Sequence, residues 1–259
     1  MTPGDAVAQA VHAQELEGWR PEDDARVALT AFATGTLGRG EYIAAAVAAA
    51  RAIDPSEQRP RLLRRYRPYY VRGTTVLRNG IGLANPVALA EAEHRVCAAR
   101  LVEIHLGAVA PGVPLVTSIH QHLFGDVYPW AGQQRIVDLR KGDAKFLPVP
   151  HLAARMAALE AGAGTVRPPD FVGPTATILA DLVAVHPFRE GNGRTATTLL
   201  AVLARRAGLP FDLRRIDRTA WMDASRAAMA ARDGDHRVPG DPFVPIVERA
   251  IGIWQSGSA

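Results

Sequence analysis

The stretch Val185-His186-Pro187-Phe188-Arg189-Glu190-Gly191-Asn192-Gly193-Arg194 lies between two segments that have the periodicity of buried helices. Apolar residues recur at helical spacing on both sides of it. They are Ile178, Leu182 and Val185 before the stretch, and Ala196, Leu199, Leu200 and Leu203 after it. Gly208 and Pro210 end the second segment. The stretch is therefore predicted to be a tight loop that opens a buried helix.

The end of this loop has the residue types of a phosphate site. Gly191 and Gly193 permit backbone conformations that other residues avoid, and they let a ligand approach the main chain. Their N–H groups and that of Asn192 lie at the predicted helix start, where free N–H groups bind phosphate. Arg194 adds a planar fork of donors for phosphate oxygens. We interpret residues 191–194 as a phosphate-binding site.

The start of the loop offers a base and a metal ligand. His186 stands at the predicted end of the preceding helix, and a histidine near neutral pKa can take a proton from an attacking hydroxyl. Glu190 is a carboxylate beside the phosphate site, as Mg²⁺ requires. Pro187 and Phe188 have structural roles, the first ending the helix and the second anchoring the loop. Residues 186–194 thus combine a group that can activate a nucleophile, a metal ligand and a phosphate-binding site. This combination within nine residues indicates a catalytic site.

The rest of the chain predicts a mainly α fold. Helices are expected over residues 85–107 and 115–124, and again from His151, Pro174 and Gly193. One hairpin interrupts them, with a strand over residues 135–139, a turn at Lys141-Gly142-Asp143 and a second strand over residues 145–147. A single hairpin in a helical chain is either a cover for the core or a functional appendage.

The first fifty residues predict three short helices. Pro3 opens the first and Gly18 closes it, Pro21-Glu22-Asp23-Asp24 opens the second, and an alanine-rich stretch through Tyr42 forms the third. A polar stretch between Pro55 and Pro60 reads as a linker. The predicted division is a small helical module over residues 1–52, a linker over 53–65 and a larger domain over 66–259.

Composition narrows the classes of protein. Hydrophobic residues make up 48% of the 259 residues, enough for a sizeable core, and the net charge of +4 is spread along the chain. Nucleic-acid and membrane partners are not expected, because no basic patch and no continuous apolar span is present. Cys97 is the single cysteine, so neither a disulfide nor a cysteine zinc site can form within the chain. With no signal peptide at its start, a cytoplasmic location is expected.

The loop from His186 to Arg194 resembles the signature of the Fic family. Three further stretches are similar to that family: residues 77–82 before its long helix, residues 122–132 after it, and residues 141–146 as its flap hairpin. The resemblance spans about residues 66–251. It implies a helical Fic fold with a small β-hairpin flap.

The resemblance also implies an activity, the transfer of AMP from ATP to a serine, threonine or tyrosine hydroxyl of a target protein. By this match His186 is the general base, Glu190 holds Mg²⁺, and Gly191, Asn192, Gly193 and Arg194 form the anion hole. The flap near Lys145 and Phe146 would align the target by main-chain pairing. The sequence leaves the oligomeric state open, a homodimer included.

The N-terminal module resembles the small antitoxin partners of Fic toxins, here fused to the enzyme. Their inhibitory helix carries Ser/Thr-x-x-x-Glu-Gly/Asn, and the matching stretch is Ala13-Gln14-Glu15-Leu16-Glu17-Gly18. Glu17 is then the inhibitory residue. A glutamate followed by glycine at a helix end is also an ordinary way to end a helix.

Two positions depart from the family pattern. Thr197 stands where the family has a second arginine, which holds the terminal phosphate and pairs with the inhibitory glutamate. Ala13 stands where the inhibitory motif has a hydroxyl residue. The departures leave two alternatives to AMP transfer: a Fic-fold transferase of another nucleotide or phosphate-linked group, or a catalytically weak nucleotide-binding regulator.

Overall fold

The computed structural model describes residues 1–53, 68–107, 116–142, 144–231 and 238–253. Packing divides the chain into two compact units, which are described separately below. Unit 1 consists of Met1–Gln14, Trp19–Val109 and Gln121–Gly132, and unit 2 of Glu15–Gly18, Ala110–His120 and Gln133–Ala259.

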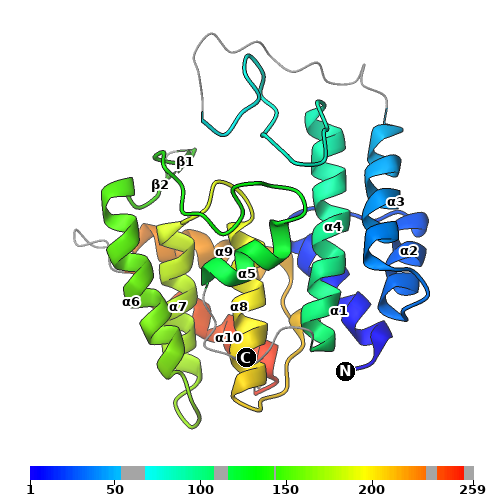
Figure 1. Cartoon of the computed structure of the whole chain (residues 1–259). Helices are drawn as coiled ribbons and strands as arrows, with labels where there is room; N and C mark the ends of the chain where they lie inside the picture. Colours follow the sequence, from blue (N-terminus) through cyan, green and yellow to red (C-terminus); the bar gives the residue numbers. More distant parts are fainter. Residues whose placement is uncertain (54–67, 108–115, 143, 232–237, 254–259) are drawn as a thin grey trace. The chain divides into compact units, whose positions relative to one another are not determined.

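Helices are the main regular structure of the described residues, so the predicted mainly α fold is confirmed (Figure 1). The α-helices are α1 Pro3–Leu16, α2 Asp23–Ala33, α3 Arg39–Arg51, α4 Pro86–Leu106, α5 Val116–Phe124, α6 Leu152–Thr165, α7 Val172–Val185, α8 Asn192–Arg206, α9 Arg218–Ala230 and α10 Val244–Ile251. Short 3-10 turns lie at Val149–His151, Leu213–Arg215 and Asp241–Phe243.

In unit 1, helices α2 and α3 pack against α4, as Figure 1 shows. The Asn85 side chain accepts hydrogen bonds from the first N–H groups of α4, and Gly107 ends the helix in a left-handed conformation with φ 96°. Small buried residues such as Ala46 and Ala92 let the helices approach closely. The three predicted N-terminal helices are therefore confirmed, and so is the predicted helix at residues 85–107.

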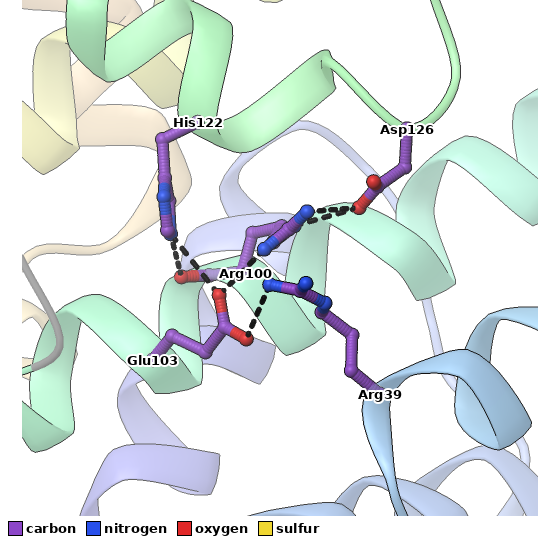
Figure 2. Close-up of polar contacts among 5 residues, drawn as sticks. All are labelled: Arg39, Arg100, Glu103, His122 and Asp126. Atoms are coloured by element: carbon purple, nitrogen blue, oxygen red, sulfur yellow. Dashed lines mark hydrogen bonds and ion pairs between the residues drawn. The ribbon is translucent and has the colours of Figure 1, made fainter.

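A network of charged side chains ties three segments of unit 1 together (Figure 2). Arg100 of α4 lies 2.9 Å from Glu103 and 2.6 Å from Asp126. Glu103 also lies 3.3 Å from the Nε2 atom of His122 and 3.8 Å from Arg39 of α3. Burial, followed by the neighbouring Arg100 charge, lowers the pKa of His122. All five side chains are used in mutual contacts, so the network has a structural role.

The residues on either side of the segment 15–18 are held by α4. Trp19 stacks on His94 with ring centroids 5.7 Å apart, and its indole N–H donates to Glu91 at 2.8 Å. Gln14 lies 2.7 Å from the Nδ1 atom of the same His94. Gln14 and Trp19, the residues that flank the segment 15–18, thus have their partners within unit 1.

Unit 2 is a helical cluster around α7. Helices α6, α8, α9 and α10 all pack on α7, and Figure 1 shows α6, α7 and α8 side by side. Most residues of α8 are buried, including Leu199 and Leu200, as their spacing predicts. Gly208, with φ 69°, follows α8 as predicted. Helices α9 and α10 were not among the sequence predictions.

The predicted hairpin is present, but its strands are shorter and begin later than expected. Strand β1, Arg140–Lys141, pairs antiparallel with β2, Ala144–Lys145. The prediction of a strand over residues 135–139 is wrong, because a side chain holds the main chain there. The Arg135 guanidinium donates to the Val137 carbonyl at 2.8 Å. Asp143 of the predicted turn lies outside the described residues.

The two compact units do not follow the predicted boundary at residue 52, since α2 and α3 pack with α4. Packing does not decide whether residues 1–52 are a module of separate origin, so that division stays a prediction. The predicted linker lies, Ile53 apart, outside the described residues.

Candidate active site

The predicted loop joins α7 to α8 in unit 2, and it turns through two left-handed residues. His186 follows the last residue of α7 with φ 48° and ψ 60°, and Gly191 precedes α8 with φ 81°. His186 is the only residue other than glycine with positive φ among those the structure describes. A left-handed conformation in a residue with a Cβ atom costs free energy, and surrounding contacts must hold it.

The side chain of Asn192 fastens the loop from within. Its Oδ1 atom accepts the Phe188 N–H and its Nδ2 atom donates to the Phe188 carbonyl, both at 2.9 Å. The Phe188 ring is fully buried and stacks on His120, with centroids 3.8 Å apart. The Nε2 atom of His120 lies 2.9 Å from the Glu190 carbonyl. The predicted anchoring role of Phe188 is confirmed, and Asn192 and His120 share it.

His186 lies against the hairpin. Its ring stacks on Phe146 with centroids 3.8 Å apart and an interplanar angle of 17°. The Nδ1 atom is buried, and within the described part of the chain no group meets hydrogen-bond geometry with it. The flap residue and the predicted base are therefore in direct contact.

Burial sets the protonation state of this ring. It lowers the pKa of His186 to about 3, and the Val183 carbonyl acts in the opposite direction. The positive charges of Arg135, Lys141 and Arg189 lower the pKa further. The pKa near neutrality expected from the sequence is therefore not found: the ring is neutral at physiological pH and can accept a proton, but it is a weaker base than an ordinary imidazole.

The start of α8 has the features of an anion site. The helix begins at Asn192, so its first N–H groups face away from the helix with no intrahelical acceptor, at the positive end of the dipole. Arg194 is 3% exposed and lies 3.8 Å from Glu190. Glu190 accepts the Gly191 N–H at 3.1 Å, and its side chain is 44% exposed.

A cavity of about 640 Å³ opens beside this helix start. His186, Asn192 and Gly193 line it, together with Lys145 and Phe146 of the hairpin region. Its apolar wall comes from α9, from Trp221, Met222 and Met229. The predicted base, part of the predicted anion hole and both flap residues thus share one cavity.

Glu17 lines the same cavity. Its carboxylate lies so close to Gly193 that a Cβ atom at residue 193 would collide with the Oε1 atom. The Leu16 carbonyl, one residue earlier, accepts a hydrogen bond from Arg218 of α9 at 3.1 Å. A carboxylate of the chain itself therefore lies at the start of α8, where an anion is favoured.

Several predicted residues stand outside this cavity. Glu190 and Arg194 belong to the loop and to α8, but they are not among the described residues that line the cavity. Thr197 is 3% exposed and donates to the Arg194 carbonyl at 3.1 Å, so its side chain also does not reach the cavity. Ala13 is buried in α1.

The sequence predictions missed the α9 wall, His120 and Arg135. The α9 residues recur at helical spacing, but that pattern predicts only a core-facing helix. Arg135 has no sequence signal, because most of its partners are backbone carbonyls of other segments. The sequence has no signal that distinguishes His120 from any other histidine on a helix.

The Fic/DOC family profile matches residues 113–204, which include α6, α7 and most of α8. "Probable protein adenylyltransferase y4lH" of Sinorhizobium fredii is 34% identical over 167 residues, 61% of this chain and 85% of that protein. "Probable protein adenylyltransferase Fic" of Salmonella typhimurium is 31% identical over 166 residues, 62% of this chain and 83% of that protein.

A solved structure agrees with these matches. The N-terminal Fic domain of an effector protein from Bartonella sp. AR 15-3 superposes with a TM-score of 0.60 at 18% identity, covering 73% of this chain and 94% of that one. The fold around the cavity is thus that of a Fic domain, and the chain belongs to the Fic/DOC family.

Proposed function

We propose that the protein is a protein adenylyltransferase, a nucleotidyltransferase that moves AMP from ATP to a hydroxyl of a target protein. The observation that carries the proposal is that His186 and the start of α8 line one cavity. A base for a hydroxyl and donors for phosphate oxygens are therefore presented to the same bound substrates. The relatives named as adenylyltransferases support the same reaction.

In the proposed reaction His186 takes the proton of the target hydroxyl as its oxygen attacks the α-phosphorus of ATP. A bond forms between that oxygen and the α-phosphorus, and the bond to the bridging oxygen breaks, so pyrophosphate leaves. The main-chain N–H groups at the start of α8 stabilise the negative charge, and the positive charge of the buried Arg194, which does not line the cavity, adds to their field. The stack on Phe146 fixes the orientation of the imidazole ring.

Glu190 fits the role of a Mg²⁺ ligand. Its carboxylate is partly exposed and lies next to the start of α8. The described residues contain no cluster of three or more acidic or histidine side chains, so Glu190 would share the ion with phosphate oxygens and water. The ion would neutralise phosphate charge.

The hairpin is the proposed docking site for the target. Its strands are short, Lys145 is exposed, and Phe146 contacts His186. An extended target segment that pairs with the hairpin main chain would place its hydroxyl beside His186. Lys145 and Phe146 would then define where the segment lies.

Glu17 is the proposed brake, supplied by an antitoxin-like N-terminal module. Its carboxylate lies at Gly193, so a phosphate oxygen cannot approach the same main chain while it stays there. Thr197 leaves no second arginine at that position for Glu17 to pair with, so the block is proposed to work by occupying the site.

No helix in the described residues has the length and apolarity of a bilayer span. The cytoplasmic location, the homodimer and the lack of nucleic-acid and membrane partners stay predictions.

Mass spectrometry of the purified chain after incubation with Mg²⁺ and ATP tests the reaction, with the chain's own hydroxyls as the available targets. An AMP adduct on serine, threonine or tyrosine, absent from the His186→Ala variant, is expected. A phosphate adduct would favour the alternative transferase. ATP binding without any adduct, in a chain freed of Glu17, would favour the nucleotide-binding regulator.

A further inference from the structure

Arg135 is a buried cation that binds backbone carbonyls. It is 1% exposed, and its Nε atom donates to the His186 carbonyl at 2.8 Å. Its two Nη atoms donate to the carbonyls of Val137 at 2.8 Å, of Val185 at 3.2 Å, and of Leu147. Its charge lies 3.8 Å from the exposed carboxylate of Asp138. The guanidinium therefore joins three separate segments of unit 2 at one point.

Two of these carbonyls belong to the end of α7. The last carbonyls of a helix have no intrahelical donor, and the negative end of the helix dipole favours a cation there. The Arg135 main-chain N–H also donates to the Pro187 carbonyl at 2.7 Å. The backbone on both sides of His186 is thus held by one residue, at the position where φ is 48°. Such a conformation persists only where its surroundings hold it.

A further carbonyl bound by Arg135, that of Leu147, belongs to the segment that follows the hairpin. Leu147 accepts from Arg135 and donates its own N–H to the Ala184 carbonyl at 3.2 Å. Its neighbour Phe146 stacks on the His186 ring. The guanidinium therefore fixes the hairpin base and the end of α7 relative to each other, and with them the two stacked rings.

Only arginine has the donor geometry for this role. A guanidinium presents five N–H donors in a rigid plane, whereas a lysine ammonium is a compact point charge with three. Lysine at 135 could keep the charge at the helix end, but it could not reach carbonyls of three segments at once.

We propose that Arg135 is a positioning residue for AMP transfer, which holds His186 and the hairpin in register without touching the substrates. The kinetic test of this inference rests on the proposed function. The second test, an NMR titration of His186, does not need the protein to be active. Arg135 also acts through its charge: the positive guanidinium near the His186 ring helps to lower the pKa of that histidine.

Arg206 offers a matched control. It also donates to backbone carbonyls near a helix end, those of Ala163 at 2.6 Å, Gly164 at 3.3 Å and Val166 at 3.3 Å. These carbonyls lie at the end of α6, and Arg206 does not line the cavity. Arg206→Lys therefore reports what the loss of a carbonyl-binding guanidinium costs in stability alone.

The experiment compares Arg135→Lys with Arg206→Lys in the full chain carrying Glu17→Gly. Single-turnover AMP transfer should fall roughly 10- to 100-fold in Arg135→Lys, because the base is displaced by a fraction of an ångström or more. ATP affinity should change less than about twofold, since the phosphate donors lie on α8. Arg206→Lys should keep the transfer rate. Equal rates in two folded variants would overturn the proposal.

If Arg135→Lys fails to fold, Arg135→Ala is assayed with added guanidinium at millimolar concentration, and partial recovery of the rate is expected. If the parent chain transfers nothing, the proposed function fails, and NMR of the His186 ring decides the positioning role. Lysine keeps the charge, but it releases the end of α7 and exposes the His186 ring. Because burial is the largest cause of the low pKa of His186, Arg135→Lys should raise that pKa while Arg206→Lys leaves it in place. An unchanged His186 titration in Arg135→Lys would contradict the positioning role directly.

Discussion

The carboxylate of Glu17 lies in the space that a side chain at Gly193 would need. The two residues are 176 positions apart in the sequence, and both line the same cavity as His186. In the proposed regulation, the lack of a side chain at Gly193 would let either a phosphate or the Glu17 carboxylate approach the main chain. The competition between these two anions is the basis of the proposed regulation.

A double-mutant cycle measures this contact. Gly193 has an ordinary helical φ, so in a Glu17→Gly background the change Gly193→Ala should stabilise the fold by about 0.5–1 kcal/mol, through helix propensity and a less flexible unfolded chain. With Glu17 present the gain should shrink or reverse, because the Cβ atom displaces the carboxylate. Chemical denaturation of the four chains gives the coupling energy.

Gly173→Ala is the control for that cycle. Gly173 is the second residue of α7, as Gly193 is of α8, and nothing lies within 4 Å of a Cβ atom built on it. Its effect should be the same with and without Glu17. A coupling of zero for Gly193 would mean that Glu17 does not rest there in solution.

Comparing Glu17→Gln with Glu17→Gly separates charge from bulk. If the carboxylate excludes ATP by occupying the anion site, Gln should relieve part of the block by losing the charge, and Gly should relieve more by clearing the space. Titration calorimetry with Mg·ATP measures both affinities. Wild-type affinity in both variants would remove Glu17 from nucleotide control.

The stacked Phe146 ring should help to keep the pKa of His186 low. Because burial is the largest cause of that low value, opening the stack with Phe146→Ala should raise the pKa from about 3 towards the ordinary imidazole value. NMR of the histidine Cε1–H signals against pH follows it, with the His186 signal identified by its loss in His186→Asn. In the wild type that signal should not shift between about pH 8 and about pH 5, well above its pKa. A midpoint near 6.5 in the wild type would contradict the burial shown by the structure.

Acid should destabilise the fold through two histidines whose pKa values are lowered by burial. The folded pKa is about 3 for His186 and about 4 for His120, chiefly through burial, against about 6.5 in the unfolded chain. The unfolded chain therefore binds more protons below pH 6.5, and stability falls as the pH falls towards the folded values. Each histidine should cost about 2 kcal/mol between about pH 7.5 and about pH 5.

His120→Gln tests this assignment. The variant should lose less stability between the two pH values than the wild type does, although it starts less stable without the stack on Phe188. The same acid loss in both chains would place its origin in other groups.

The sequence predicted the site best where local pattern and chemistry coincide. The loop from His186 to Arg194 combines helix periodicity on both sides with glycines that have positive φ or close neighbours, so its place between α7 and α8 is correct. Glu17 was found through a short motif, and the structure brings it into the same cavity.

The rest depended on contacts between distant segments. The strand expected at residues 135–139 does not form, because the Arg135 guanidinium binds the Val137 carbonyl and, at the same time, carbonyls up to 51 positions away, a constraint that no local propensity contains. The α9 wall of the cavity has the pattern of any amphipathic helix, so only the fold reveals which face meets the site. Thr197 differs from the family pattern at a buried position, and only the structure shows that its hydroxyl is used by the Arg194 carbonyl.

The most direct test of AMP transfer uses ATP labelled at either the α- or the γ-phosphate, incubated with Mg²⁺ and the Glu17→Gly chain. The α-label should become covalently attached to protein and the γ-label should not, because pyrophosphate leaves. The wild-type chain should incorporate less, and Glu17→Gly combined with His186→Ala should incorporate about 10²- to 10⁴-fold less than Glu17→Gly alone. Covalent γ-label, or α-label that persists without His186 in a folded chain, would contradict the account.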